Sequence, residues 1–166
     1  MAYSSLAIAN EFIRLARSAS QDITHMQLQK LVYLAHGWNM AINKQPLIED
    51  EFEAWEFGPV IRRLYDALKR WGKHPVGQMI RWGDDTGFAD DDDGVANDVV
   101  SPEERAVIDK VWKTYGKLQA FQLSALTHEP DTPWYAKYQQ GRNHKIPAQS
   151  IREYFVKLAL KSRATA

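Results

Sequence analysis

The chain contains no cysteine among its 166 residues. This absence excludes a disulfide-stabilised scaffold, a thiolate metal site and a cysteine nucleophile, and it fits a reducing compartment. Long hydrophobic runs are also missing, because Asn10, Glu11 and Arg14 interrupt the first apolar segment. We therefore expect no signal peptide, no membrane span and no membrane partner, and we expect a cytoplasmic location.

The common sequence patterns of catalytic sites are missing as well. No glycine-rich phosphate loop and no G-x-S-x-G nucleophile turn occurs, and no two of the five histidines stand four residues apart, as in a helical zinc site. The aspartates around Gly94 do not fit a calcium loop, because Ala89 and Val100 occupy two positions that need oxygen ligands. The sequence predicts no catalytic residue, no cofactor and no metal. A hydrolase that uses His128 with Glu129 or Asp131 is the enzymatic alternative.

The net charge is zero, but the charges are unevenly distributed. Residues 84–104 contain nine acidic residues and no Lys or Arg, whereas residues 105–166 carry 11 Lys and Arg against 4 Asp and Glu, a net charge of +7. A nucleic-acid-binding protein would favour a basic total, so this separation is more typical of protein partner recognition or internal compensation. Within the acidic part, we expect residues 84–98 to form a mobile loop.

Apolar periodicity predicts a mainly α protein of six to seven helices in one domain that covers residues 1–166. Helix-start signals are clear at three places: Thr24 with Gln27, Ser101 before Pro102, and Thr132 before Pro133. The second helix has the widest apolar face and should be central. The predicted helices cover residues 5–19, 25–43, 59–71, 101–116, 120–127 and 132–139, with a last helix from 147 onward.

A small β element is expected directly after the second helix. Leu47 and Ile48 would pair with a strand over residues 52–57, forming a hairpin over an acidic tip. Gly58 and Pro59 would then lead straight into the third helix, because proline suits the first helical position. A short strand over residues 78–82 is a further option in an otherwise irregular stretch.

Aromatic residues provide the candidate partner-binding surface. Six tryptophans are present, and tryptophan is enriched at protein interfaces, although a core position is the ordinary alternative for each one. The residues that we select as partner-binding candidates are Trp55, Phe57, Tyr65, Trp134 and Tyr138.

Three sequence blocks occur in an order that resembles the Panacea domain family. They are L-Q-K-L-V-Y at residues 28–33, A-W-E-F-G-P-V at 54–60 and L-T-H-E-P-D-T-P-W at 126–134. Members of this bacterial family are described as phage-associated proteins and as antitoxins of toxin–antitoxin pairs. The resemblance implies a mostly helical domain with a small β element, no enzymatic activity, and neutralisation of a cognate toxin protein by direct binding.

The motif residues have two open interpretations. We expect the second helix, the strand–helix junction and the Thr-His turn to converge, either as a polar network that specifies the fold or as a docking cleft. The residues concerned are Gln29, Lys30, Tyr33, Trp38, Gly58, Pro59, Thr127 and His128.

Other partners remain open at this stage. The basic C-terminal helix gives the alternative of a nucleic-acid-binding regulator that acts on DNA, and a second copy of the chain or a protease are further options. The basic residues concerned are Arg152, Lys157, Lys161 and Arg163.

Overall fold

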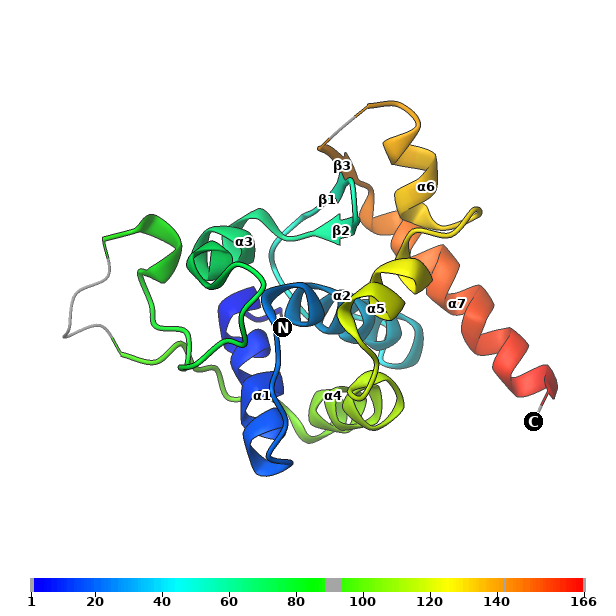
Figure 1. The fold of residues 1–166 in the computed structure, drawn as a ribbon. Coiled ribbons are helices and arrows are strands. Elements are labelled where there is room, and N and C mark those ends of the chain that lie inside the picture. The colour runs from blue at the N-terminus through cyan, green and yellow to red at the C-terminus, as the bar shows by residue number, and fades with distance from the viewer. Residues whose placement is uncertain (1, 89–93, 142, 166) are drawn as a thin grey trace.

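The central helix, α2 (His25–Ile42), runs through the middle of the molecule (Figure 1). The computed structural model describes residues 2–88, 94–141 and 143–165. These residues form seven α-helices and three short strands, which confirms the predicted mainly α class with a small sheet. The other helices are α1 (Ser5–Ser18), α3 (Arg62–Leu68), α4 (Pro102–Tyr115), α5 (Ala120–Thr127), α6 (Pro133–Tyr138) and α7 (Ala148–Thr165).

The other helices surround α2 and bury it on nearly all sides. Its start is fixed by the predicted capping box, in which the Thr24 side chain accepts from the Gln27 backbone N–H and the Gln27 side chain accepts from the Thr24 N–H. Most of its residues are buried, polar ones included, and it packs against α1, α4, α5 and α7. A helix that is buried on nearly all sides becomes the axis of the core.

The sheet lies at one side of this helical core and has the order β2-β1-β3, with both pairs antiparallel. Strand β1 (Phe52–Trp55) is in the middle, β2 (Gly58–Val60) forms a tight hairpin with it, and β3 (His144–Ile146) comes from the chain just before α7. The predicted pairing of Leu47 and Ile48 with this strand is wrong. Both of their backbone N–H groups donate instead to Nδ1 of buried His36 on α2.

The predicted start of the third helix is also wrong. Pro59 lies opposite Ala54 in the sheet, and α3 begins only at Arg62. A short 3-10 turn (Lys69–Trp71) continues this helix to Gly72, where the sequence predicted its end. Residues 58–60 form strand β2 instead, because side chains of α2 hold this backbone in the extended conformation.

The irregular stretch between α3 and α4 is fixed to α1 by one side chain. The amide of Asn10, which is fully buried, donates to the carbonyls of Ile80 and Ala96 at 2.8 and 2.9 Å and accepts from the Ile80 N–H. The optional strand over residues 78–82 is reduced to an isolated bridge between Arg81 and Val95.

The acidic segment is anchored at both of its described ends. Asp85 pairs with Arg63 at 3.1 Å, and the Asp98 carboxylate accepts from the Ser4 backbone N–H. The predicted mobility of residues 84–98 stays a prediction, since residues 89–93 at its centre lie outside the described residues. Among the helices that the structure describes, none has the length and apolar character needed to cross a membrane.

Candidate functional site

Lys30 is the centre of a buried network that we call the polar junction, made of Gln29, Lys30, Gly58, Pro59 and Thr127. Its side chain is 1% exposed, and its Nζ donates to the carbonyl of Pro59 at 2.8 Å. Burial lowers the pKa of Lys30 to about 7, because the charged form has lost its water. The amine is therefore held where its charge is costly.

Gly58 brings the β2 backbone against this amine. Its φ is +113°, and a Cβ at this position would lie 2.8 Å from Thr127 Oγ1 and 3.1 Å from Lys30 Nζ. Only a residue without a side chain allows α2, β2 and α5 to approach this closely.

Gln29 fixes the chain just after β2. Its amide accepts from the Ile61 N–H at 2.9 Å and donates to the Ile61 carbonyl at 3.2 Å, while its Nε2 lies 3.1 Å from Nε2 of His25. Burial, followed by the charge of Lys30, lowers the pKa of His25 to about 4. The Gln29 side chain thus takes the place of a backbone hydrogen-bond partner for Ile61. The chain stays extended here, and α3 begins only at Arg62.

The end of α5 completes the junction from the opposite side. Ser124 Oγ donates to the carbonyl of Phe57 at 2.6 Å, and Thr127 Oγ1 donates back to the carbonyls of Leu123 and Ser124. The His128 ring contacts the Ser124 carbonyl through Nδ1. The three motif blocks therefore do converge in space, as the sequence analysis predicts.

Trp134 lies beneath the hairpin and not on the surface. It is 5% exposed, its indole N–H donates to the carbonyl of Trp55, and its ring stacks on Tyr138 with centroids 4.7 Å apart. His128 contacts the same ring edge-on at 5.1 Å. Of the five selected aromatic residues, Trp134 thus supports the hairpin from inside, and the partly exposed Tyr138 packs on Trp134.

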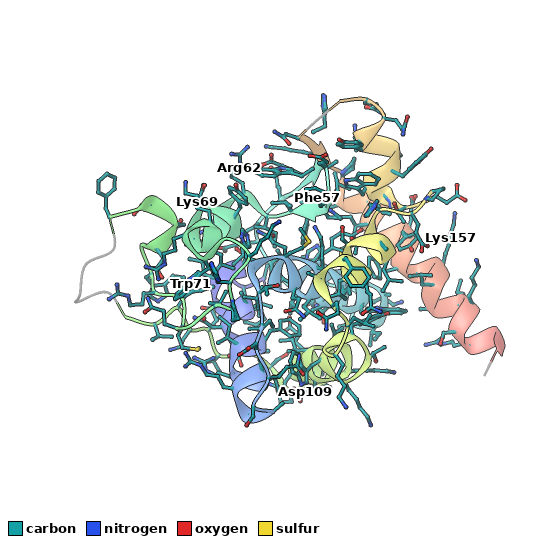
Figure 2. The ribbon with its side chains drawn as sticks, in the orientation of Figure 1. Phe57, Arg62, Lys69, Trp71, Asp109 and Lys157 are labelled. Atoms are coloured by element: carbon teal, nitrogen blue, oxygen red, sulfur yellow. The ribbon has the colours of Figure 1, made fainter. Side chains whose placement is uncertain are left out.

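The other three selected aromatics lie at the outer side of the hairpin, together with one arginine that the sequence analysis missed. We call Trp55, Phe57, Arg62 and Tyr65 the aromatic edge; Figure 2 labels Phe57 and Arg62. The rings of Trp55 and Tyr65 are 4.8 Å apart, the Arg62 guanidinium lies 4.8 Å above the Trp55 ring, and Phe57 is 56% exposed. Arg62 has no sequence signal of its own beyond its place after a β-hairpin.

Two motif residues lie further along α2, toward its C-terminal end. Tyr33 and Trp38 both contact the Phe155 ring of α7 edge-on, at 5.7 and 5.6 Å. The Trp38 indole N–H also donates to the hydroxyl of Tyr115 at 3.3 Å. These residues connect α2 to α4 and α7 and take no part in the polar junction. Within the described ranges, no group of three or more His, Asp or Glu side chains could hold a metal ion.

The fold and the polar junction define a mainly α protein with a small antiparallel sheet, in which the three motif blocks meet. The family described as "Antitoxin SocA-like, Panacea domain" matches residues 28–135, and this chain belongs to it. A similar protein is Antitoxin SocA of Caulobacter vibrioides strain NA1000 / CB15N, which is 32% identical over 132 residues. That match covers 77% of this chain and 66% of the relative's length. No solved structure matches this chain.

Proposed function

We propose that this protein is an antitoxin that neutralises a toxin protein by binding it directly through the aromatic edge. The family description and the name of the relative both support an antitoxin role. The observation that carries the binding surface is the exposed Phe57 in the turn of the same hairpin whose Trp55 ring stacks against Arg62. Trp, Tyr and Arg are the residue types that dominate binding energy at protein interfaces.

The edge is rigidly mounted, which suits it for this role. The carbonyl of Phe57 accepts from Ser124 and that of Trp55 from Trp134, so the backbone on both sides of the turn is fixed by other elements. Side chains that are already ordered lose less conformational entropy on binding. In this proposal Trp55, Phe57 and Tyr65 contact the toxin, while Trp134 and Tyr138 hold the hairpin in place. Burying a toxin surface of standard size would remove roughly 1,200–2,000 Å² from water, so residues around the edge contribute as well.

The test compares two exposed phenylalanines. Phe57→Ala removes the most exposed side chain of the edge, whereas Phe88→Ala removes an 88% exposed ring within the acidic segment. Small open reading frames beside the gene are expressed alone to find one that arrests growth, and the antitoxin variants are then co-expressed with it.

We expect Phe57→Ala to lose protection and to weaken toxin binding roughly 30-fold or more, as for an interface hot spot. Phe88→Ala should protect like the parent chain, and both variants should keep the parent's helical circular dichroism spectrum. Equal protection by the two variants would move the toxin-binding surface away from the aromatic edge.

The distribution of basic residues around α7 gives little support to the alternative of a DNA-binding regulator. Its four basic residues are exposed, but at about 100° per residue they divide into two groups on opposite faces of the helix. Arg152 and Arg163 share one face, and Lys157 and Lys161 share the other. A helix that binds a phosphate backbone would present them as a single stripe.

A further inference from the structure

A concave surface lies between α2, the end of α4, the α5–α6 turn and α7. It is a cleft of about 370 Å³, and Trp38, Tyr115, Tyr154 and Phe155 form much of its wall. Figure 1 shows α7 running past α2 and α5 on this side, with its C-terminal end projecting outward. A volume of this size is within the range of ordinary ligand sites, which is about 300–1,000 Å³. The cleft shares no lining residue with the aromatic edge.

The inner wall of the cleft carries a polar group that the fold does not satisfy. Tyr33 is 1% exposed, and its hydroxyl has no hydrogen-bond partner among the described residues. Burial, with a smaller contribution from Tyr154, raises the pKa of Tyr33, so the hydroxyl stays neutral and keeps lone pairs free to accept. A buried hydroxyl without a partner destabilises a protein, and phenylalanine would fit the same space at no such cost.

The outer part of the cleft is acidic. Glu129 is the only charged residue among the described residues that line it. The pKa of Tyr154 is raised first by burial and next by the negative charge of Glu129. The Glu129 carboxylate therefore acts on the α7 wall of the cleft. An anionic ligand would be repelled by this carboxylate, and an apolar ligand would leave the Tyr33 hydroxyl unpaired.

We propose that this cleft binds an arginine side chain of a protein partner. A guanidinium group is planar and stacks on aromatic rings, and its five N–H donors can reach several acceptors at once. In the cleft it would lie between the Trp38 and Tyr154 walls and pair with Glu129, and a shift of the Tyr33 side chain toward the cleft would bring its buried hydroxyl oxygen within reach of a guanidinium N–H. The tyrosine hydroxyl and the carboxylate are both acceptors, which is the complement of a donor-only cation.

Three short peptides test the ligand class. Acetyl-Gly-Arg-Gly-amide is titrated into the full chain labelled with ¹⁵N, and its citrulline and norleucine counterparts serve as neutral polar and apolar controls. The arginine peptide should shift the Trp38 indole N–H signal and saturate in the millimolar range, at least about fivefold tighter than either control. Equal shifts from all three peptides, or no shift at Trp38 with the arginine peptide, would overturn the proposal.

Two variants test the residues. Tyr33→Phe should raise Tm by a few degrees, because it removes the unpaired hydroxyl, and should weaken the arginine peptide several-fold. Glu129→Gln should also weaken binding of the arginine peptide. Glu153→Gln is the control and should not, because Glu153 is an exposed acid of α7 that accepts a hydrogen bond from Gln149. If Tyr33→Phe is stabilised but binds the arginine peptide as tightly as the parent, the Tyr33 hydroxyl is not an acceptor for arginine and the proposal is wrong. Phe57→Ala should leave peptide binding intact, so this proposal and the antitoxin proposal fail separately.

Discussion

At the scale of single residues, the polar junction is organised around an amine that folding deprives of water. Lys30 has a carbonyl partner in Pro59, and the Thr127 hydroxyl lies beside the same glycine, but among the described residues Lys30 forms no ion pair with an acidic side chain. A buried charge without a counter-ion is expensive, and the depressed pKa is the consequence. The junction therefore specifies how α2, β2 and α5 meet, at a cost in stability near neutral pH.

This cost predicts a pH dependence with a definite sign. The pKa of Lys30 falls from 10.5 to about 7 on folding, so between these values the unfolded chain binds a proton that the folded chain has released. The free energy of unfolding should therefore rise with pH from 7 to 9.5, by up to about 1.4 kcal/mol per pH unit. Urea titrations of the parent and of Lys30→Met measure it. The rise should disappear in the variant, and an equal rise in both would assign it to other groups.

Gly58 gives a second prediction at this scale. Gly58→Ala should destabilise the fold by more than about 2 kcal/mol, because the new Cβ meets Thr127 and the Lys30 amine while the backbone keeps a φ of +113°. Gly87→Ala is the matched control: its φ is +75°, and nothing lies within 4 Å of the new Cβ. The control should cost only about 1 kcal/mol in urea unfolding. Similar losses for both would show that the junction can relax around a methyl group.

At the scale of elements, the sequence predicts what is determined locally. The caps at Thr24, Ser101 and Thr132 satisfy backbone N–H groups within their own helices, and those three helices begin where expected. The strands depend on distant partners and are predicted poorly. The bonds from Gln29 to Ile61 and from Lys30 to Pro59 keep an apparent helix start extended, and His36 prevents pairing at Leu47 and Ile48.

The candidate site shows the same division. The ordered motif blocks indicate that α2, the hairpin and the α5 end meet, and the contacts of Ser124 and Thr127 bear this out. The sequence does not predict strand β3, because its partner, β1, lies about ninety residues earlier and no pattern in His144–Ile146 indicates the pairing. Arg62 and the unpaired Tyr33 hydroxyl were missed for a similar reason, since each acquires its significance only from neighbours that the fold supplies.

The contact between α2 and α7 provides the prediction at this scale. At Gly37, an added Cβ would lie 2.2 Å from two carbons of the Phe155 ring. Gly37→Ala should therefore push α7 outward and cost at least about 2 kcal/mol, despite the better helix propensity of alanine. Faster amide hydrogen exchange along α7 would report the displacement.

Two further variants control this experiment. Gly94→Ala adds the same methyl group where nothing lies within 4 Å, and it should change stability by less than about 1 kcal/mol. Adding Phe155→Leu to Gly37→Ala makes room for the methyl group, so the double variant should lose less than the sum of the single losses. Strict additivity would mean that the two residues do not press on one another.

At the scale of the whole molecule, one hydrophobic cluster connects elements from both ends of the chain. It contains Phe12 of α1, Val32 of α2, Leu64 of α3, Ile108 of α4 and Phe155 of α7. Every one of these helices also packs directly on α2. Because α2 belongs to the core of each neighbour, no group of helices can separate without exposing apolar surface on it.

This shared axis predicts that the chain unfolds as one cooperative unit, as the proposed single domain requires. Urea unfolding followed by far-ultraviolet circular dichroism reports the helices, and tryptophan fluorescence reports tertiary packing at six positions between residues 38 and 134. We expect both signals to give one transition with the same midpoint and the same slope. Since Phe155 packs against both Tyr33 and Trp38, α7 should lose its amide protection in that same transition. An earlier transition confined to α7, or separate midpoints for the two signals, would divide the chain into independent units and contradict the single domain.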